Sequence, residues 1–310
     1  MLARVTVIAL NTYREAVRAR VLHGLFGLAL ATAAYCLVVG EFALRSSLRV
    51  VSDLGAASVS IYGIVVSVVL GATSLYRELE LKTIFPILAR PVYRSEYLVG
   101  KYLGTLCTIS VFIAANGGIL LLALAFMSGE APARGPVDLL VTTLVFLVVG
   151  LRVPRARTYL PIPYALVLLG SGYFLAAVAP DDRRVIVSAA VLTLSEVAIV
   201  AAVATVFSSF SSPFLTATFT FGVFIIGRSA DTLANLPERL FGHFLHELAV
   251  FASKVVPNLM LYVPPRSLLT GEAPGVTLGR YLLVAAGHAL CWSVALLAVA
   301  SALFRKRDFL

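Results

Sequence analysis

The chain has 310 residues, of which 60% are hydrophobic and 13% are charged, and its formal net charge at pH 7 is +9. Such proportions lie far outside those of soluble globular domains, so they exclude soluble enzymes and soluble binding modules as a class. The basic residues gather beside the ends of apolar runs, where they set the orientation of a membrane protein. The positive charge therefore does not indicate nucleic-acid binding.

The first 21 residues carry an amphipathic pattern. If the segment is helical, one side is apolar and is formed by Val5, Ile8, Ala9, Tyr13 and Val17. The other side carries Arg14, Glu15 and Arg18. This pattern is typical of a helix that lies in the headgroup layer with its arginines near lipid phosphates. The alternative interpretation is a plain positively charged anchor on the inner side of the membrane.

Eight apolar runs follow, and a run of about 18 residues crosses the ~30 Å hydrocarbon layer as a helix. Six runs meet or approach that length: Val21–Val39, Gly55–Leu75, Tyr102–Met127, Ile186–Phe210, Phe214–Ile226 and Leu282–Phe304. Two further runs, Leu139–Leu151 and Leu160–Ala179, lie between the third and fourth of these. The run Leu139–Leu151 is short for a span, so a re-entrant segment is its alternative. We predict an all-α polytopic membrane bundle of six core helices plus an extra pair, eight spans in total.

The charges flanking these runs predict the topology. With the N-terminus in the cytoplasm and eight crossings, 15 of the 25 basic residues fall on the inner side, and most acidic residues fall outside. The basic turn Arg152–Arg157 between the two extra runs then lies inside. The orientation does not depend on those runs, because they add an even number of crossings. We expect a multi-pass protein of the bacterial plasma (inner) membrane with both termini in the cytoplasm.

A polar segment, residues 76–101, separates the second and third runs. Its apolar residues at positions i, i+3, i+4 and i+7 form one face of a two-turn helix, and they are Leu81, Ile84, Phe85 and Leu88. Pro91 ends this helix, although Pro86 counts against a regular one. An apolar face exposed on a short helix needs a partner groove. The alternative is that the helix packs on the inner surface of its own chain.

Glu196 lies within the fourth long apolar run. An ionisable side chain at membrane depth is a candidate for a role in substrate passage or gating. The alternative is a structural carboxylate, hydrogen-bonded to serines or tyrosines of neighbouring spans.

The outer segment, residues 230–280, is too apolar for a free loop, and charged residues interrupt it too often for a ninth span. We expect an interfacial or re-entrant helix around residues 240–251. His243, His246 and Glu247 have the spacing i, i+3, i+4 and could share a metal ion. Interfacial polar faces carry the same residue types, and HFLHE matches no zinc-protease pattern. We therefore predict no metal site.

Motifs for nucleotide binding and for common hydrolases do not occur in the sequence. There is no G-x-x-x-x-G-K-[ST], so the chain does not bind ATP in the P-loop manner. G-x-S-x-G and H-E-x-x-H do not occur either. We predict a non-catalytic chain without a cofactor of its own, which must take its energy from elsewhere.

Four segments resemble a known family. They are Ile8–Leu22, Tyr76–Gly104, Ser208–Phe214 and Phe304–Phe309. Together they resemble the ABC-2 type transporter permeases, in particular those similar to the permease serving copper-site maturation of nitrous oxide reductase. The resemblance covers most of the chain except about residues 130–185, and its most specific part is residues 76–101.

This resemblance implies one transmembrane domain over residues 1–310, with an elbow helix at 1–21, a cytoplasmic coupling region at 76–101 and cap helices at 230–280. It implies partners as well, namely a second copy of the chain, two ABC ATPase subunits that bind the ATP, and the lipid bilayer. The implied elbow residues are Arg14, Glu15 and Arg18. The implied cap residues are Phe244, Leu248 and Phe251. The implied ATPase-coupling residues are Glu78, Glu80, Leu81, Lys82, Thr83, Ile84, Phe85, Leu88, Arg90, Pro91 and Arg94.

The chain departs from the family pattern at residues 130–185, where two apolar runs replace a short outer loop. Three functions remain open. The first is the permease subunit of an ABC exporter. The second is a mechanotransmission module of the same architecture that acts on an extracytoplasmic accessory protein and moves no substrate. The third is a lipid-linked membrane enzyme, which the coupling region disfavours because an enzyme has no need of a helix that docks on a motor.

Overall fold

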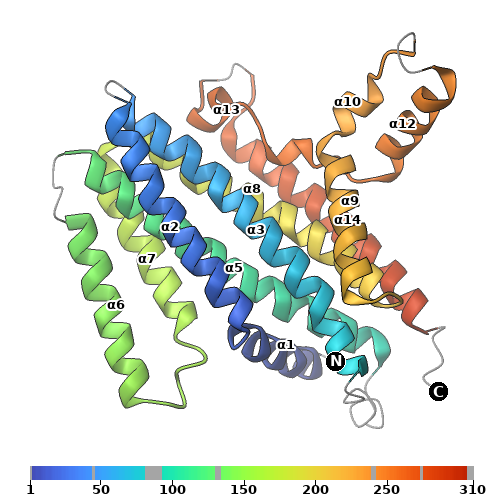
Figure 1. The fold of residues 1–310 in the computed structure, drawn as a ribbon, viewed down its shortest axis with the longest axis horizontal. Coiled ribbons are helices and arrows are strands. Elements are labelled where there is room, and N and C mark those ends of the chain that lie inside the picture. Colours follow the sequence, from blue (N-terminus) through green and yellow to red (C-terminus); the bar gives the residue numbers. More distant parts are fainter. Residues whose placement is uncertain are drawn as a thin grey trace.

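The computed structural model describes residues 2–43, 46–80, 93–129, 134–238, 242–272 and 275–305. All regular structure in these residues is helical (Figure 1). Seven of the described helices, one of them extended by a 3-10 turn, are long and apolar enough to cross a membrane. They are α2 (Arg20–Phe42), α3 (Ser47–Glu80), α5 (Arg94–Met127), α6 (Arg134–Arg152), α7 (Pro161–Leu175) with η1 (Ala176–Val178), α8 (Pro180–Ser208) and α14 (Leu278–Arg305). The chain is a multi-pass helical membrane protein, as predicted.

The predicted span Phe214–Ile226 lies in α9 (Pro213–Arg228), an apolar helix of only 16 residues. At 1.5 Å per residue it is about 24 Å long, less than the ~30 Å of hydrocarbon. The sequence had cast doubt on Leu139–Leu151 instead. That run lies in α6, which reaches 19 residues because the helix already begins at Arg134. Seven of the described helices, rather than the eight expected, are thus long enough to span, and α9 is not.

Three helices form the centre of the bundle and the others surround them. In the most apolar 18-residue stretch of α5, 78% is buried, compared with 11% in the corresponding stretch of α6. The helices α3 and α8 are also mostly buried, whereas α2, α7 and α14 expose most of their surface. This division follows from composition, because α5 carries small residues that allow neighbouring helices to approach. At Gly118, for example, an added Cβ would lie 2.6 Å from the backbone of Leu168 in α7.

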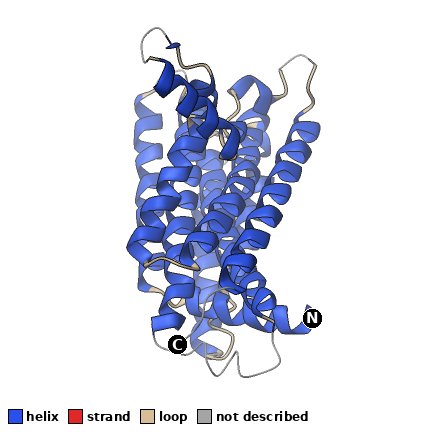
Figure 2. Cartoon of the chain, turned by 90° about the vertical axis from the view of Figure 1, so that its right-hand side faces the viewer, coloured by secondary structure: helices blue, strands red, loops and turns tan. Residues whose placement is uncertain are grey.

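The two ends of the bundle differ (Figures 1 and 2). At one end, helix α1 (Leu2–Val17) lies across the ends of the long helices. It is close to the last turn of α3, the first turn of α5 and the last turn of α14. We call this the α1 end. At the opposite end, α10 (Ala230–Ala234), α12 (His243–Val255), η2 (Met260–Tyr262) and α13 (Arg266–Thr270) form a cap. Figure 1 shows α10 and α12 projecting beyond the spans.

Candidate functional site

The first turn of α5 begins at Arg94, the last of the predicted coupling residues. The backbone N–H of Tyr93 donates to the Glu96 carboxylate at 3.2 Å, which fixes the first turn of the helix. Arg94 donates to the backbone oxygen of Phe304 at 3.2 Å. The rings of Tyr97 and Phe304 stack with centroids 6.4 Å apart. The start of α5 is therefore attached to the end of α14.

Helix α1 rests on the backbone of α5 through two glycines. An added Cβ at Gly104 would lie 2.4 Å from the carbonyl oxygen of Ala9, and one at Gly100 would lie 2.7 Å from Ile8. Both contacts are closer than a side chain tolerates. Because the two glycines are one helical turn apart, they form a groove along α5 that only an unsubstituted backbone leaves open.

A buried lysine joins three helices at the same place. Lys101 of α5 is 4% exposed, and its Nζ lies 3.5 Å from the carboxylate of Glu15 in α1. The same ammonium donates to the backbone oxygen of Ser74 in α3 at 3.4 Å. A buried charge is costly unless it is paired, so these contacts favour one arrangement of α1, α3 and α5. Arg4 and Glu96 add a second ion pair between α1 and α5, at 3.8 Å.

The predicted elbow residues divide between two partners. Glu15 contacts Lys101 of α5, whereas Arg14 and Arg18 face the turn between α6 and α7. The guanidinium of Arg14 lies 4.9 Å from the ring centroid of Tyr159, and Arg18 reaches the hydroxyl of Thr158 at 3.5 Å. Both arginines are exposed at the surface. The extra helix pair is thus in contact with α1, which the sequence did not predict.

The predicted coupling residues fall mostly outside the described residues. Those outside are Leu81, Lys82, Thr83, Ile84, Phe85, Leu88, Arg90 and Pro91. Glu78 and Glu80 lie in the last turn of α3, and Arg94 begins α5. The undescribed segment therefore lies between the end of α3 and the start of α5, two helices that are mostly buried.

Glu196 forms an ion pair inside the bundle. Its carboxylate accepts two hydrogen bonds from Arg228, from Nε to Oε1 and from Nη2 to Oε2, each 2.7 Å long. Nη2 of Arg228 also donates to the hydroxyl of Ser60 in α3 at 2.9 Å. The carboxylate is fully buried, and this bidentate geometry is the strongest that a carboxylate and a guanidinium form. The pair joins α3, α8 and α9.

The position of Arg228 explains this pairing. It is the last residue of α9, the helix that is too short to cross the membrane, so its side chain lies at the depth of Glu196. The sequence left two alternatives for Glu196, a role in substrate passage or gating and a structural carboxylate bonded to serines or tyrosines. Ser60 does belong to the cluster, through Arg228. The arginine itself was missed because it follows an apolar run and reads as a flanking charge. The short length of that run was the signal for it.

Hydrogen bonds hold the cap to the end of α9. After α12 the chain returns, and the backbone N–H of Leu259 donates to the carbonyl of Gly227 at 2.9 Å. Asn258 donates to Asp231 of α10 at 2.8 Å. Tyr262 is hydrogen-bonded to the carbonyl of Ala285 in α14 at 3.2 Å, and burial raises the pKa of its hydroxyl. The cap is thus fixed at its base, beside the ion pair of α9.

A second charged cluster joins the cap to the ends of α3 and α8 that lie opposite the α1 end. Arg266 of α13 donates to Asp182 at 2.5 Å, to Ser52 at 3.1 Å and to Asp53. Burial alone lowers the pKa of Arg266, but its hydrogen bond to Asp182 and the charge of Asp53 outweigh burial and raise it. The guanidinium therefore stays charged and links three segments that are far apart in the sequence.

The predicted cap residues project away from the bundle. Phe244, Leu248 and Phe251 all lie on α12, and all three are exposed, with Phe244 at 76%. In the same helix, His243 lies 2.9 Å from Glu238 and 3.2 Å from Glu247, while His246 contacts the backbone of Leu236. The described part of the chain contains no cluster of three or more metal-binding side chains.

Comparison with known proteins gives one result for the whole chain. Residues 6–309 match the family model described as ABC-2 family transporter protein. No curated protein matches the chain. The family match extends across residues 130–185, where the motif resemblance did not reach, and it does not distinguish the permeases of copper-site maturation from other members.

Proposed function

Since the chain belongs to the ABC-2 family of transporter proteins, we propose that it is the non-catalytic transmembrane subunit of an ABC transporter. Two copies pair in the membrane, and each docks a separate ATPase through residues 81–91. ATP binding and hydrolysis in the ATPases then move the spans and export a substrate. The chain contributes no P-loop, so the nucleotide is bound by the partner.

The observation that carries this proposal is the set of contacts at the foot of α5. Residues 81–92 connect α3 to α5, and the first ten residues of α5 contact α1, α3 and α14 through Glu96, Lys101 and Tyr97. A displacement of the connecting segment is therefore delivered to three helices at once. The close backbone contacts at Gly100 and Gly104 leave no room for the helices to shift against one another, so we propose that the motion is of the rigid-body kind.

Helix α3 connects the α1 end to the cap. It contacts Lys101 near Ser74, Arg228 at Ser60 and Arg266 at Ser52. Its 34 residues correspond to about 51 Å, so one continuous helix runs from the proposed docking segment to the opposite surface. This geometry supports transmission of ATPase movement to the cap without a further hinge in α3.

The proposed topology places the α1 end in the cytoplasm. Most basic residues flank the spans at that end, as the positive-inside rule requires. The proposed pairing of two copies follows from the preference of identical chains for two-fold symmetry and from the two ATPases that such a dimer would hold.

The test is to charge the proposed docking face. Phe85→Asp places a carboxylate in the proposed joint, whereas the control Phe85→Leu keeps an apolar side chain at the same position. Burying an unpaired carboxylate costs several kcal/mol, so we expect only Phe85→Asp to lose the ATPase on co-purification. Recovery of the ATPase with Phe85→Asp at undiminished yield contradicts the proposal.

A second candidate function is mechanical transmission to an accessory protein on the cap side. The observation that favours it is the row of exposed apolar side chains on α12, including Phe244, Leu248 and Phe251. ATP-dependent efflux from proteoliposomes of the permease and its ATPase distinguishes the two functions. Efflux supports export. An ATPase-active complex without efflux, whose α12 cross-links to an accessory protein in cells, supports transmission.

A further inference from the structure

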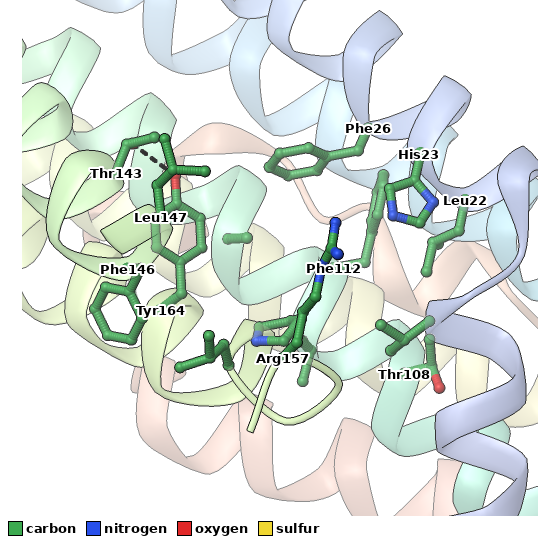
Figure 3. A pocket seen from close by; sticks show the side chains of 15 residues that line it. Leu22, His23, Phe26, Thr108, Phe112, Thr143, Phe146, Leu147, Arg157 and Tyr164 are labelled. Carbon is green, nitrogen blue, oxygen red and sulfur yellow. Dashed lines mark hydrogen bonds between the residues drawn. The ribbon is translucent and has the colours of Figure 1, made fainter. Parts of the chain in front are cut away.

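A cavity of about 390 Å³ lies between the extra helix pair and the core. It is enclosed by α2, α5, α6 and α7 and by the turn that joins α6 to α7 (Figure 3). We call it the insert cavity. Its wall is almost entirely apolar and includes Leu22, Phe26, Phe112, Phe146, Leu147 and Tyr164.

The packing of α7 explains why this space is open. Further toward the cap, α7 touches α5 through Gly172, where an added Cβ would lie 2.8 Å from the carbonyl oxygen of Gly118. Toward the α1 end, the turn after α6 contacts α1 instead, because the rings of Tyr13 and Tyr159 stack at 6.4 Å. The pair therefore leans away from α5 at this end, and no described side chain fills the gap.

Part of the cavity wall lies at the surface of the bundle, which lipid covers in a membrane protein. Leu147 lines it from α6 and is 56% exposed, and α6 is the least buried of the seven long helices described. An apolar space of this size at such a surface is accessible to an acyl chain. Pockets of a few hundred Å³ are also within the usual range for small-molecule sites.

One end of the cavity carries a positive charge. Arg157 lies in the turn after α6, and Figure 3 shows its side chain pointing into the cavity toward His23 and Phe112. The backbone N–H of Arg157 donates to the carbonyl of Pro154 at 3.3 Å, but no hydrogen bond or ion pair joins its guanidinium to a described residue. Arg14 and Arg18 contact the same turn, and none of the lining residues is acidic.

We propose that the insert cavity binds one anionic phospholipid, with an acyl chain against Phe26, Phe112 and Leu147 and the phosphate on the guanidinium of Arg157. Basic pockets between transmembrane helices at the membrane surface are known to hold anionic lipid headgroups. The almost entirely apolar wall fits an acyl chain and offers few polar partners to a free anion, which favours a lipid over a free anion. This site does not depend on the proposed docking of an ATPase.

Such a lipid would complete the contact between the extra helix pair, α6 and α7, and the rest of the molecule. It would fill the space between α6, α7 and α5 and would bring a negative charge to a turn surrounded by Arg14, Arg18 and Arg157. The extra helix pair would then be held by lipid on one side and by α1 on the other.

The experiment is native mass spectrometry of the purified full chain, titrated with phosphatidylglycerol or with phosphatidylcholine of the same acyl chains. We expect one phosphatidylglycerol to be retained in preference to phosphatidylcholine. Arg157→Gln should weaken this retention about five-fold, the effect of one basic side chain at a membrane surface. Arg155→Gln, in the same turn but outside the cavity, should retain lipid as the parent chain does, and so should Arg157→Lys.

A second pair of variants tests the acyl-chain site. Leu147→Trp fills the cavity and should abolish retention, whereas Val145→Trp points away from it and should not. The native charge-state distribution and the helical circular dichroism check that each variant is folded. Inorganic phosphate should not displace the lipid. Equal retention of both lipids, equal effects of Arg157→Gln and Arg155→Gln, retention by folded Leu147→Trp, or displacement by phosphate would each overturn the proposal.

Discussion

Removing the arginine of the buried ion pair should be among the most destabilising single changes in the described part of the chain. Arg228→Met keeps an unbranched aliphatic stem but removes the guanidinium and with it both 2.7 Å hydrogen bonds to Glu196. Breaking a buried pair in this way costs ~3–5 kcal/mol, because the remaining charge has no partner. Two hydrogen bonds to a charged group, at ~1.5–3 kcal/mol each, give a similar sum. We expect a loss of this size in the free energy of unfolding.

Removing both charges should cost less than removing one. Glu196→Leu together with Arg228→Met leaves no unpaired ion, and replacing a buried pair by apolar side chains is often neutral or stabilising. The hydroxyl of Ser60 then loses only one donor. The double variant is therefore expected to be clearly more stable than Arg228→Met and close in stability to the parent chain.

The assay is reversible unfolding of the purified protein in mixed micelles, followed by circular dichroism. The matched control is Arg184→Met, which breaks the 3.7 Å pair with Asp181, where both side chains are more than half exposed. It also removes the 3.3 Å hydrogen bond from Arg184 to the carbonyl of Thr270, a loss of ~0.5–1.5 kcal/mol. An exposed pair of this kind contributes ~0–1 kcal/mol. A cost for Arg228→Met within about 1 kcal/mol of that control, or a double variant no more stable than the single one, would refute this reasoning.

Three other predictions follow from the contacts at the two ends. Gly104→Ala should lower the free energy of unfolding by ~1–3 kcal/mol and release α1 from α5, since its Cβ would meet backbone. Gly170→Ala, which has open space around it, should do neither. Limited proteolysis measures the release of α1, and unfolding measures the stability. Arg266→Leu should cost ~1–3 kcal/mol and increase cleavage of the cap, whereas Arg49→Leu, which removes a 3.7 Å contact to Asp53, should cost under ~1 kcal/mol; equal effects would contradict the cluster. A cysteine at position 155 in a background without native cysteines should react with an impermeant maleimide only after cell lysis, and labelling of intact cells would contradict the proposed topology.

The long helices were predictable because span length and hydrophobicity are local properties. A run such as Tyr102–Met127 needs no partner to be recognised, and the structure places it in α5. The helical segment at the N-terminus was also predictable from its pattern, with α1 ending at Val17. Its buried side rests on Gly100 and Gly104, which a single sequence does not reveal as a helix groove.

Pairings between distant residues could not be predicted in the same way. Glu196 and Arg228 lie on different helices, and their contact depends on α9 ending inside the bundle. Arg266 reaches Asp53 across more than 200 residues of sequence. The insert cavity depends on how α7 leans on α5, which is a matter of packing angle. Each of these features is set by tertiary geometry that hydrophobic periodicity does not encode.

The two charged clusters determine which parts of one subunit move together. The pair of Glu196 with Arg228 holds α9 against α3 and α8, and Arg266 holds the cap against the outer ends of the same two helices. Separating either cluster would leave charges without partners, which costs several kcal/mol, whereas a displacement of the exposed helix α2 would break neither cluster. We infer that α3, α8, α9 and the base of the cap move as one body. If two copies pair as proposed, a route across the membrane would then open between them, while the buried ion pair inside each copy stays closed.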